Sequence, residues 1–251
     1  MISLGYCEET IAMMELGLCE GIGPVVGKHL IQYFGSAQGV FQATKIDWQG
    51  LTGLSIKLSH QLQLSKDNGC KAARELAENH QELNIRGTSI SHPDYPHRLL
   101  ELANAPLVLF SVGDTPWNAP RIIGVIGTRK PTPQGIAYTK SWVEKLSQYN
   151  VVMVSGLAYG IDIVAHQAAL DAGIPNFAVM AHGLDHIYPT QHRQVAEQMQ
   201  SHGGGLIADF PAHTKMHPDY FPKRNRIVAG LCDALLVIES GVKGGSMITA
   251  S

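Results

Sequence analysis

The sequence predicts an α/β protein, in which a parallel sheet with helices on both faces follows a small all-α domain. From residue 121 onward, short apolar runs alternate several times with helical patterns, and glycine-containing loops separate them. Apolar runs of this kind are typical of strands that are covered on both faces. Residues 1–84, by contrast, carry helical periodicity and no convincing strand pattern. We therefore expect a helical domain over residues 1–84 and an α/β domain over residues 85–251.

Helices separated by glycine turns account for the first domain. Residues 9–18 form an apolar-rich helical pattern that ends at Glu20-Gly21-Ile22-Gly23-Pro24, and residues 25–34 form the next. In a weaker copy, the turn of residues 51–55 leads into a helical run over residues 56–64. Helix, glycine turn and helix resembles helix-hairpin-helix units, whose turns present backbone N–H groups to a phosphate. The alternative is a small bundle with glycine C-caps, which the net negative charge of this segment favours.

Residues 85–120 are predicted to be an ordered connector with one short strand, because five prolines punctuate a stretch that also holds apolar groups. Beyond it we expect five strands and three helices. The strands are predicted over residues 122–126, 151–154, 177–181, 206–208 and 235–238, and the helices over residues 134–148, 161–172 and 191–200. Ligands of such sheets bind beyond the carboxyl ends of the strands, where the glycine loops lie.

The composition excludes several classes of protein. No apolar run reaches the roughly 18 residues of a membrane span, and the acidic N-terminus is unlike a signal peptide. The four cysteines show no CxxC spacing and are expected to be reduced thiols of a cytoplasmic protein. The His182/His186 and His213/His217 pairs have no third ligand at metal-site spacing, so no metal is expected.

The charge is unevenly distributed. The whole chain has a formal net charge of −2, whereas residues 121–226 carry 10 basic and 7 acidic side chains. Such a local excess can neutralise phosphates, although the charge distribution alone favours a solvated charged face.

The loop Gly127-Thr128-Arg129 follows the first strand of the α/β domain. It lacks the second and third glycines of a dinucleotide fingerprint, so a nicotinamide or flavin cofactor is not expected. It does place a guanidinium, which suits bidentate phosphate contact, where a strand meets a helix.

The second loop, Ser155-Gly156-Leu157-Ala158-Tyr159-Gly160, offers a hydroxyl and backbone N–H groups to an anion. Asp162 is expected to cap the following helix and His166 to be a packed histidine. Ser155 lacks the G-x-S-x-G context of a hydrolytic nucleophile.

A third segment, residues 218–226, combines Tyr220 and Phe221 with Lys223, Arg224 and Arg226. Cations for the backbone and ring faces for the bases are what single-stranded nucleic acid requires. A core aromatic residue beside a charged helix start is the alternative.

Together these segments resemble the DNA-processing protein A (DprA/Smf) family over nearly the whole chain. The resemblance is carried by these residues: Ile126-Gly127-Thr128-Arg129, Ser155-Gly156-x-Ala158-x-Gly160-Ile161-Asp162-x-x-Ala165-His166, Gly183-x-Asp185-x-x-Tyr188-Pro189, Phe221-Pro222-x-Arg224-Asn225-Arg226-Ile227, and Glu239 with Gly245-Ser246-x-Ile248-Thr249-Ala250. The segments Tyr95-Pro96 and Gly21-Ile22-Gly23-Pro24 also match the family.

The resemblance implies a SAM-like or helix-hairpin-helix domain followed by an extended Rossmann-like domain that binds single-stranded DNA. It also implies a protein without catalytic activity that protects incoming strands during natural transformation, assists RecA loading and acts as a dimer. By motif, the DNA-contacting residues would be Arg129, Ser155, Gly156, Phe221, Lys223, Arg224 and Asn225. Arg129 and Arg224 would hold phosphates, Phe221 would stack on a base, and Ser155 and Gly156 would donate hydrogen bonds.

The sequence departs from the family pattern in Ala208-Asp209, in Gly244-Gly245, and in stopping at Ser251 within an expected helix. The resemblance thus implies a member shortened at its C-terminus, with incomplete dimer contacts.

The alternative function is a nucleotide phosphoribohydrolase of the lysine-decarboxylase-like group, whose PGGxGT-x-x-E pattern is matched only in part around Gly244 and Thr249.

Overall fold

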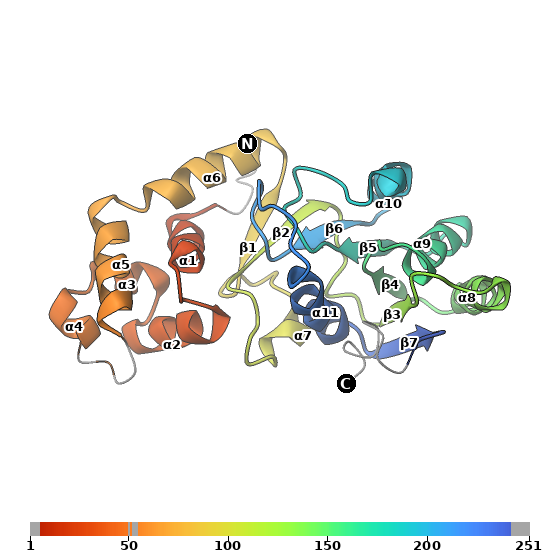
Figure 1. Cartoon of the computed structure of the whole chain (residues 1–251), viewed down its shortest axis with the longest axis horizontal. Helices are drawn as coiled ribbons and strands as arrows, with labels where there is room; N and C mark the ends of the chain where they lie inside the picture. The colour runs from red at the N-terminus through yellow and green to blue at the C-terminus, as the bar shows by residue number, and fades with distance from the viewer. Residues whose placement is uncertain (1–5, 50, 52–54, 242–251) are drawn as a thin grey trace. The chain divides into compact units, whose positions relative to one another are not determined.

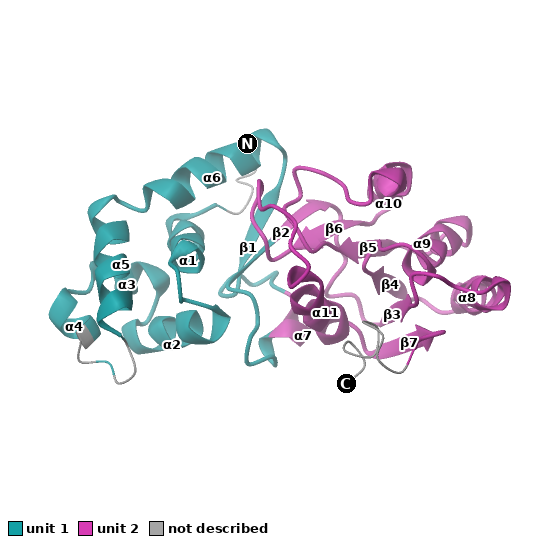
Figure 2. Ribbon diagram, viewed as in Figure 1, with its two compact units in different colours: residues 1–95, 100–109 teal, residues 96–99, 110–251 magenta. Residues whose placement is uncertain are grey.

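The computed structural model describes residues 6–49, 51 and 55–241 (Figure 1). Its contacts divide the chain into two compact units: unit 1 holds residues 1–95 and 100–109, and unit 2 holds residues 96–99 and 110–251 (Figure 2). Unit 1 thus includes much of the segment that we expected to be a connector, and the domain boundary after residue 84 stays a prediction.

Unit 1 begins with helices, as the sequence pattern indicates. Their bounds are α1 Glu8–Leu18, α2 Pro24–Phe34, α3 Ala37–Gln42, α4 Lys45–Gln49, α5 Ile56–Asp67 and α6 Lys71–Glu82. Pro24 starts α2 where no backbone N–H is needed, and Gly35, with φ of 81°, ends it in the left-handed conformation. The second predicted glycine turn falls mainly on residues 52–54, which lie outside the described residues.

Two carboxylates of α1 stabilise other helices of unit 1. Glu9 accepts hydrogen bonds from the N–H groups of Ala37 and Gln38 at 2.6 and 3.0 Å, at the start of α3. Glu15, which is buried, accepts one from the N–H of Ala73 in the first turn of α6 at 3.1 Å. Carboxylates at these positions satisfy free N–H groups and complement the helix dipole.

Within the described residues, the sheet has seven strands in the order β1-β2-β6-β5-β4-β3-β7. Their bounds are β1 Arg86–Ser89, β2 Val108–Gly113, β3 Ile122–Gly127, β4 Val152–Ser155, β5 Asn176–Val179, β6 Gly205–Ala208 and β7 Ala234–Ile238. Strands β3 to β7 pair in parallel, which confirms the predicted fold class. The connector contributes two strands rather than one, and β2, which lies between β1 and β6, runs antiparallel to β6.

Helices cover both faces of the parallel part. They are α8 Pro133–Leu146, α9 Ile161–Asp171, α10 Arg193–Ser201 and α11 Tyr220–Leu231, with a 3₁₀ turn at Thr190–His192 and a short α7 at His97–Leu100. Figure 1 shows α8, α9 and α10 on one face and α11 on the other. The core between α8, α9 and the sheet is aliphatic, with Val125, Val143, Met153, Ile161 and Ala165 buried.

Helix α11 was anticipated only in the alternative interpretation of the third segment, as a charged helix start, and Pro222 lies within it. Pro222 is the third residue of the helix, where the missing N–H would have no partner in the preceding turn. The helix places Phe221, Lys223 and Arg224 within its first turn and a half.

Candidate nucleic-acid interface

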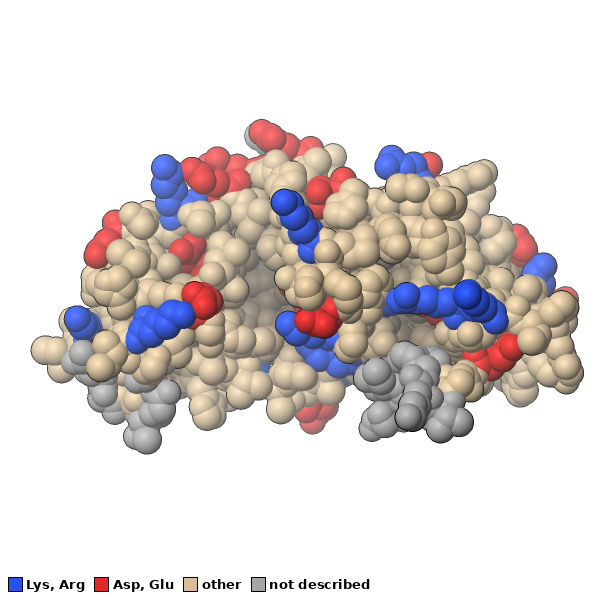
Figure 3. Space-filling model, in the orientation of Figure 1, with Lys and Arg blue, Asp and Glu red and all other residues tan. Residues whose placement is uncertain are grey.

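A hollow with an open volume of about 370 Å³ lies in unit 2 at the carboxyl ends of the parallel strands. Its wall includes Arg129, Gly156, Phe221 and Arg224, four of the seven predicted DNA-contacting residues. They come from the loops after β3 and β4 and from the start of α11. Figure 3 shows Lys and Arg atoms gathered on unit 2 over β3, β4 and the loop that leads into α8. Separate segments of the chain thus meet at one cationic rim.

Arg129 is the exposed cation of this rim. Its guanidinium lies over the ring of Phe221, 5.0 Å from the centroid, which is cation–π geometry. The loop that carries it is held on two sides: the N–H of Thr128 donates to the carbonyl of Glu239 at 2.9 Å, and the carbonyl of Thr128 accepts from the N–H of Ile161 at 3.1 Å. The guanidinium and the ring therefore present a charged and an apolar surface side by side.

The loop after β4 bonds to itself and to the sheet. The hydroxyl of Ser155 is fully buried and donates to the carbonyl of Val125 at 2.5 Å. The carboxylate of Asp162 accepts from the N–H groups of Gly156 and Ala158 at 3.2 and 3.4 Å. The donors that we expected Ser155 and Gly156 to offer to DNA are thus used within the protein. The expected capping role of Asp162 is wrong: Gly160 is the N-cap of α9, and the Asp162 carboxylate, in the first turn of that helix, closes the preceding loop instead.

Arg224 is buried, with 4% of its surface exposed. Its Nη1 donates to the carbonyl of Gly156 at 2.7 Å and to that of Val179, and its Nε donates to Oδ1 of Asn225 at 3.0 Å. Burial lowers the pKa of Arg224, which the nearby charge of Asp162 opposes. Burial likewise raises the pKa of Asp162. The Arg224 side chain thus joins the loop after β4 to the end of β5 beneath the hollow, and the phosphate contact expected of it stays a prediction.

Gly156 is required by the same packing. A Cβ atom at residue 156 would lie 2.1 Å from Nη1 of Arg224 and 2.5 Å from its Cζ. Contacts this short are not found in proteins, so the guanidinium occupies the space that a side chain would need.

Lys223 and its neighbours extend the rim along α11. Lys223 is exposed, and its Nζ lies 5.4 Å from the ring centroid of Tyr220. That ring in turn stacks on Phe210, with centroids 4.4 Å apart and planes inclined by 24°. Asn225 is half-buried and bonds to Arg224. Of the third segment, Lys223 is exposed and Phe221 is half-buried, whereas Arg224 and Asn225 bond to each other within the protein.

Two tyrosines at the hollow were missed by the sequence analysis as site residues. Tyr159 and Tyr188 line it and are 43% and 41% exposed. The Tyr159 hydroxyl donates to Oε1 of Gln191 at 3.1 Å, and its ring meets His192 edge-on at 5.1 Å. Both tyrosines stand in loops after predicted strands, one beside Gly160 and one beside Pro189. A tyrosine in a loop at the carboxyl end of a strand has no core to pack into, and this position is the signal that could have identified both residues.

The histidines near the hollow do not assemble a metal site. Among the residues that the structure describes, no group of three or more His, Cys, Asp or Glu side chains could hold a metal ion. His182 is buried, stacks on His186 with centroids 4.3 Å apart, and has its pKa lowered by burial.

Within the same described ranges, no helix combines the length and apolar character that crossing a bilayer requires.

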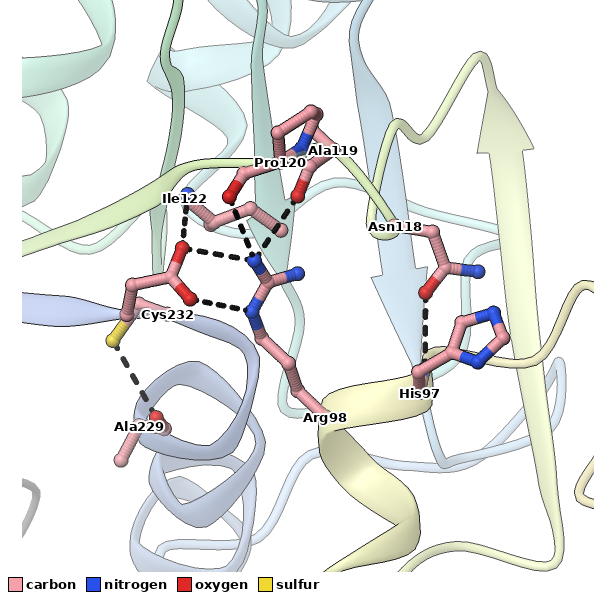
Figure 4. Close-up of polar contacts among 9 residues, drawn as sticks. His97, Arg98, Asn118, Ala119, Pro120, Ile122, Ala229 and Cys232 are labelled. Atoms are coloured by element: carbon pink, nitrogen blue, oxygen red, sulfur yellow. Dashed lines mark hydrogen bonds and ion pairs between the residues drawn. The ribbon is translucent and has the colours of Figure 1, made fainter.

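The motif around Tyr95-Pro96 contributes a structural pair rather than a wall of the hollow. In unit 2, Arg98 donates from Nε and Nη2 to the two carboxylate oxygens of Asp233 at 2.8 and 2.9 Å (Figure 4). Asp233 also accepts from the N–H of Ile122 at 2.7 Å. The pair therefore joins α7 to the start of β3 and to the residue between α11 and β7.

Comparisons with known proteins identify the family and the fold of this chain. The curated Protein Smf of Synechocystis is 35% identical over 236 residues, which cover 92% of this chain and 58% of the relative. The DNA processing protein DprA of Bacillus subtilis is 38% identical over 181 residues, covering 72% of this chain and 60% of the relative. The chain thus spans about three fifths of the length of these two relatives.

Two solved structures share the fold. DNA processing protein A of Streptococcus pneumoniae matches with a TM-score of 0.77 and 27% identity, over 96% of this chain and 81% of that one. DNA processing protein A of Helicobacter pylori, described for its single-stranded DNA binding mode, matches with a TM-score of 0.59 and 30% identity, over 65% and 74% of the two chains. Residues 86–251 match the model of the family described as DNA recombination-mediator protein A. The chain belongs to this family.

Proposed function

We propose that this chain binds single-stranded DNA at the hollow of unit 2 and acts as a recombination mediator in DNA uptake. The observation that carries the proposal is the exposed Arg129 guanidinium over the Phe221 ring at the rim. Such a rim offers charge to a phosphate and a ring face to an unpaired base, and each stacked base contributes roughly 1–3 kcal/mol. Duplex DNA keeps its bases stacked inside and cannot use the rings.

The proposed contacts follow from exposure. Arg129 and Lys223 contact phosphates, Phe221 stacks on a base, and Tyr159 and Tyr188 provide further ring faces. Arg224, Ser155, Gly156 and Asn225 hold the loops in place. This division of roles is supported by the burial of Arg224 and Ser155 and by the exposure of Arg129 and Lys223.

The wider role rests on family membership. The family resemblance supports protection of incoming single strands in the cytoplasm, assistance in RecA loading and action as a homodimer, without catalysis. The phosphoribohydrolase alternative depends on the stretch from Gly244 to Thr249, which lies outside the described residues, and no described contact favours it.

Binding of fluorescein-labelled oligo-dT, measured by anisotropy over a range of salt concentrations, tests the proposal. Arg129→Ala should weaken binding at least about tenfold and lower the salt slope by about 1, because one phosphate contact is lost. Phe221→Ala should weaken it by about 1–3 kcal/mol with an unchanged salt slope.

Lys140→Ala, which removes an exposed cation from α8, is the matched control and should change affinity less than about twofold. Equal losses for Arg129→Ala and Lys140→Ala would show that the rim is not the binding surface. Release of adenine from AMP by the wild-type chain would favour the enzyme alternative.

A further inference from the structure

Glu239 is exposed, yet both its carbonyl and its carboxylate accept hydrogen bonds from the loop that carries Arg129. It follows β7 and adopts the left-handed conformation, with φ of 53°. Its carbonyl accepts from the N–H of Thr128 at 2.9 Å. Its carboxylate accepts from the N–H of Thr132 at 2.9 and 3.1 Å and from the Thr132 hydroxyl at 3.1 Å. Glu239 thus holds the loop at both ends, at Thr128 just before Arg129 and at Thr132 three positions after it.

The carboxylate also stands at the N-terminus of α8. Thr132 caps that helix, since its hydroxyl oxygen accepts from the N–H of Gly135 at 3.1 Å. A Cβ at residue 135 would lie 2.1 Å from Oε2 of Glu239, so glycine makes room for the carboxylate. A helix N-terminus attracts anions. Here the protein supplies the anion itself, and a phosphate at the rim must depend on side-chain cations instead.

The other side of the loop is equally constrained. The N–H of Ile161 donates to the carbonyl of Thr128, and a Cβ at Gly160 would lie 2.7 Å from Cα of Arg129. The backbone of Arg129 is therefore packed directly against the start of α9 on one side and tied to Glu239 on the other. A side chain whose backbone is fixed in this way loses less freedom when it binds.

We propose that Glu239 is a positioning residue that fixes the Arg129 loop for phosphate contact. The proposal rests on the proposed function, and it goes beyond that function by assigning a role in DNA binding to an acidic residue that does not touch the DNA.

The sign of the effect distinguishes positioning from bulk electrostatics. Glu239 is an exposed negative charge close to a cationic rim, so its removal would by charge alone strengthen binding to a polyanion. Positioning makes the opposite prediction, namely weaker binding when the loop is released.

The test compares Glu239→Ala, Glu239→Gln and the matched control Glu144→Ala in the full chain. Glu144 is an exposed carboxylate near the other end of α8. We expect Glu239→Ala to weaken oligo-dT binding by about three- to tenfold, because the loop must then be ordered on binding. Glu239→Gln keeps an acceptor oxygen and should retain part of the affinity, whereas Glu144→Ala should leave binding unchanged or slightly stronger.

A double-mutant cycle separates positioning from general damage. In an Arg129→Ala background, measured at low salt, Glu239→Ala should have little further effect, because the residue acts through Arg129. An equal loss in both backgrounds would overturn the proposal, as would unchanged or stronger binding by Glu239→Ala in the wild-type background. If Glu239→Ala does not fold, the same cycle with Glu239→Gln decides.

The proposed function fails separately, when wild-type protein does not bind oligo-dT at all. Amide hydrogen exchange at Thr128 and Thr132 then still tests the restraint: faster exchange in Glu239→Ala supports it, and unchanged exchange overturns it.

Discussion

The cations of unit 1 and those around the hollow of unit 2 differ in what they contact. In residues 1–84, five of the six Lys and Arg side chains bond to groups of unit 1: Lys57 to Glu20, Lys71 to Glu75, Arg74 to Glu8, Lys28 to the Leu102 carbonyl, and Lys66 to the carbonyls of Gln42 and Ala43. Figure 3 shows blue and red side by side over this unit. At the hollow, by contrast, Arg129 and Lys223 lie over aromatic rings and remain exposed.

The difference indicates that the availability of a cation for a ligand depends on the protein group that it already contacts, and less on how many cations a region holds. A guanidinium paired with a carboxylate must break that pair before it can bind a phosphate, whereas one resting on a ring keeps its N–H groups available. Within unit 2 the same contrast recurs between exposed Arg129 and buried Arg224. Three predictions test these distinctions, from the largest effect to the smallest.

The largest effect is expected from an ion pair of unit 2 that is mostly shielded from solvent. Arg226 and Asp209 are 2.6 Å apart, with side chains 20% and 11% exposed, and burial raises the pKa of Asp209. Arg226→Ala leaves a buried carboxylate without its cation and should lower the free energy of unfolding by about 3–5 kcal/mol, measured by urea denaturation.

The control is the Arg74–Glu8 pair of unit 1, whose side chains are 46% and 58% exposed. Arg74→Ala should cost less than about 1 kcal/mol. Comparable losses for the two variants would contradict the importance that we assign to burial.

An intermediate effect is expected from pH. Burial lowers the pKa of His166 to about 4, against the hydrogen bond of its Nδ1 to Asn176, which raises it. The folded state therefore resists a proton that the unfolded state takes up near pH 6.5, and stability falls as the pH drops below 6.5 toward 4. Between pH 7 and 5 the wild-type chain should lose about 2 kcal/mol more than His166→Gln. Parallel stability curves for the two proteins would show that His166 takes up its proton while folded.

The smallest effect is expected from the exposed ion pairs of unit 1. The double variant Lys57→Ala, Arg74→Ala removes two positive charges, yet its affinity for oligo-dT should stay within about twofold of wild type, because both side chains are already paired. Anisotropy titrations under the conditions used for Arg129→Ala check this. A loss of about tenfold would mean that unit 1 belongs to the DNA interface.

Much of the fold could be predicted because its strands are continuous apolar runs. Two examples are residues 122–126 and 235–238, which show no helical periodicity. They lie in β3 and β7. Short elements escaped prediction for local reasons. Helix α3 has only six residues, too few for a clear periodic pattern, and its N-terminus is capped both by the adjacent Ser36 and by Glu9 of α1, a contact that no local pattern reveals. Its stability thus depends partly on a distant segment of the chain.

The candidate site could be located from the sequence, although the roles of its residues could not. The glycine loops and the basic segment around Arg224 indicated which turns meet, whereas burial is a property of the assembled chain. Arg129 and Arg224 are the same residue type and were expected to have the same role, yet one lies on a ring at the surface and the other beneath Gly156. The hydroxyl of Ser155 is likewise bonded to Val125, thirty residues earlier in sequence.

The contact between Gly156 and Arg224 has a consequence for how this family can vary. Since the guanidinium fills the space where a Cβ would stand, any substitution at residue 156 requires the Arg224 side chain to move or to be replaced by a smaller one. Loss of Arg224 alone would open a void and leave two carbonyls without donors. The residues at positions 156 and 224 are therefore expected to covary among related proteins.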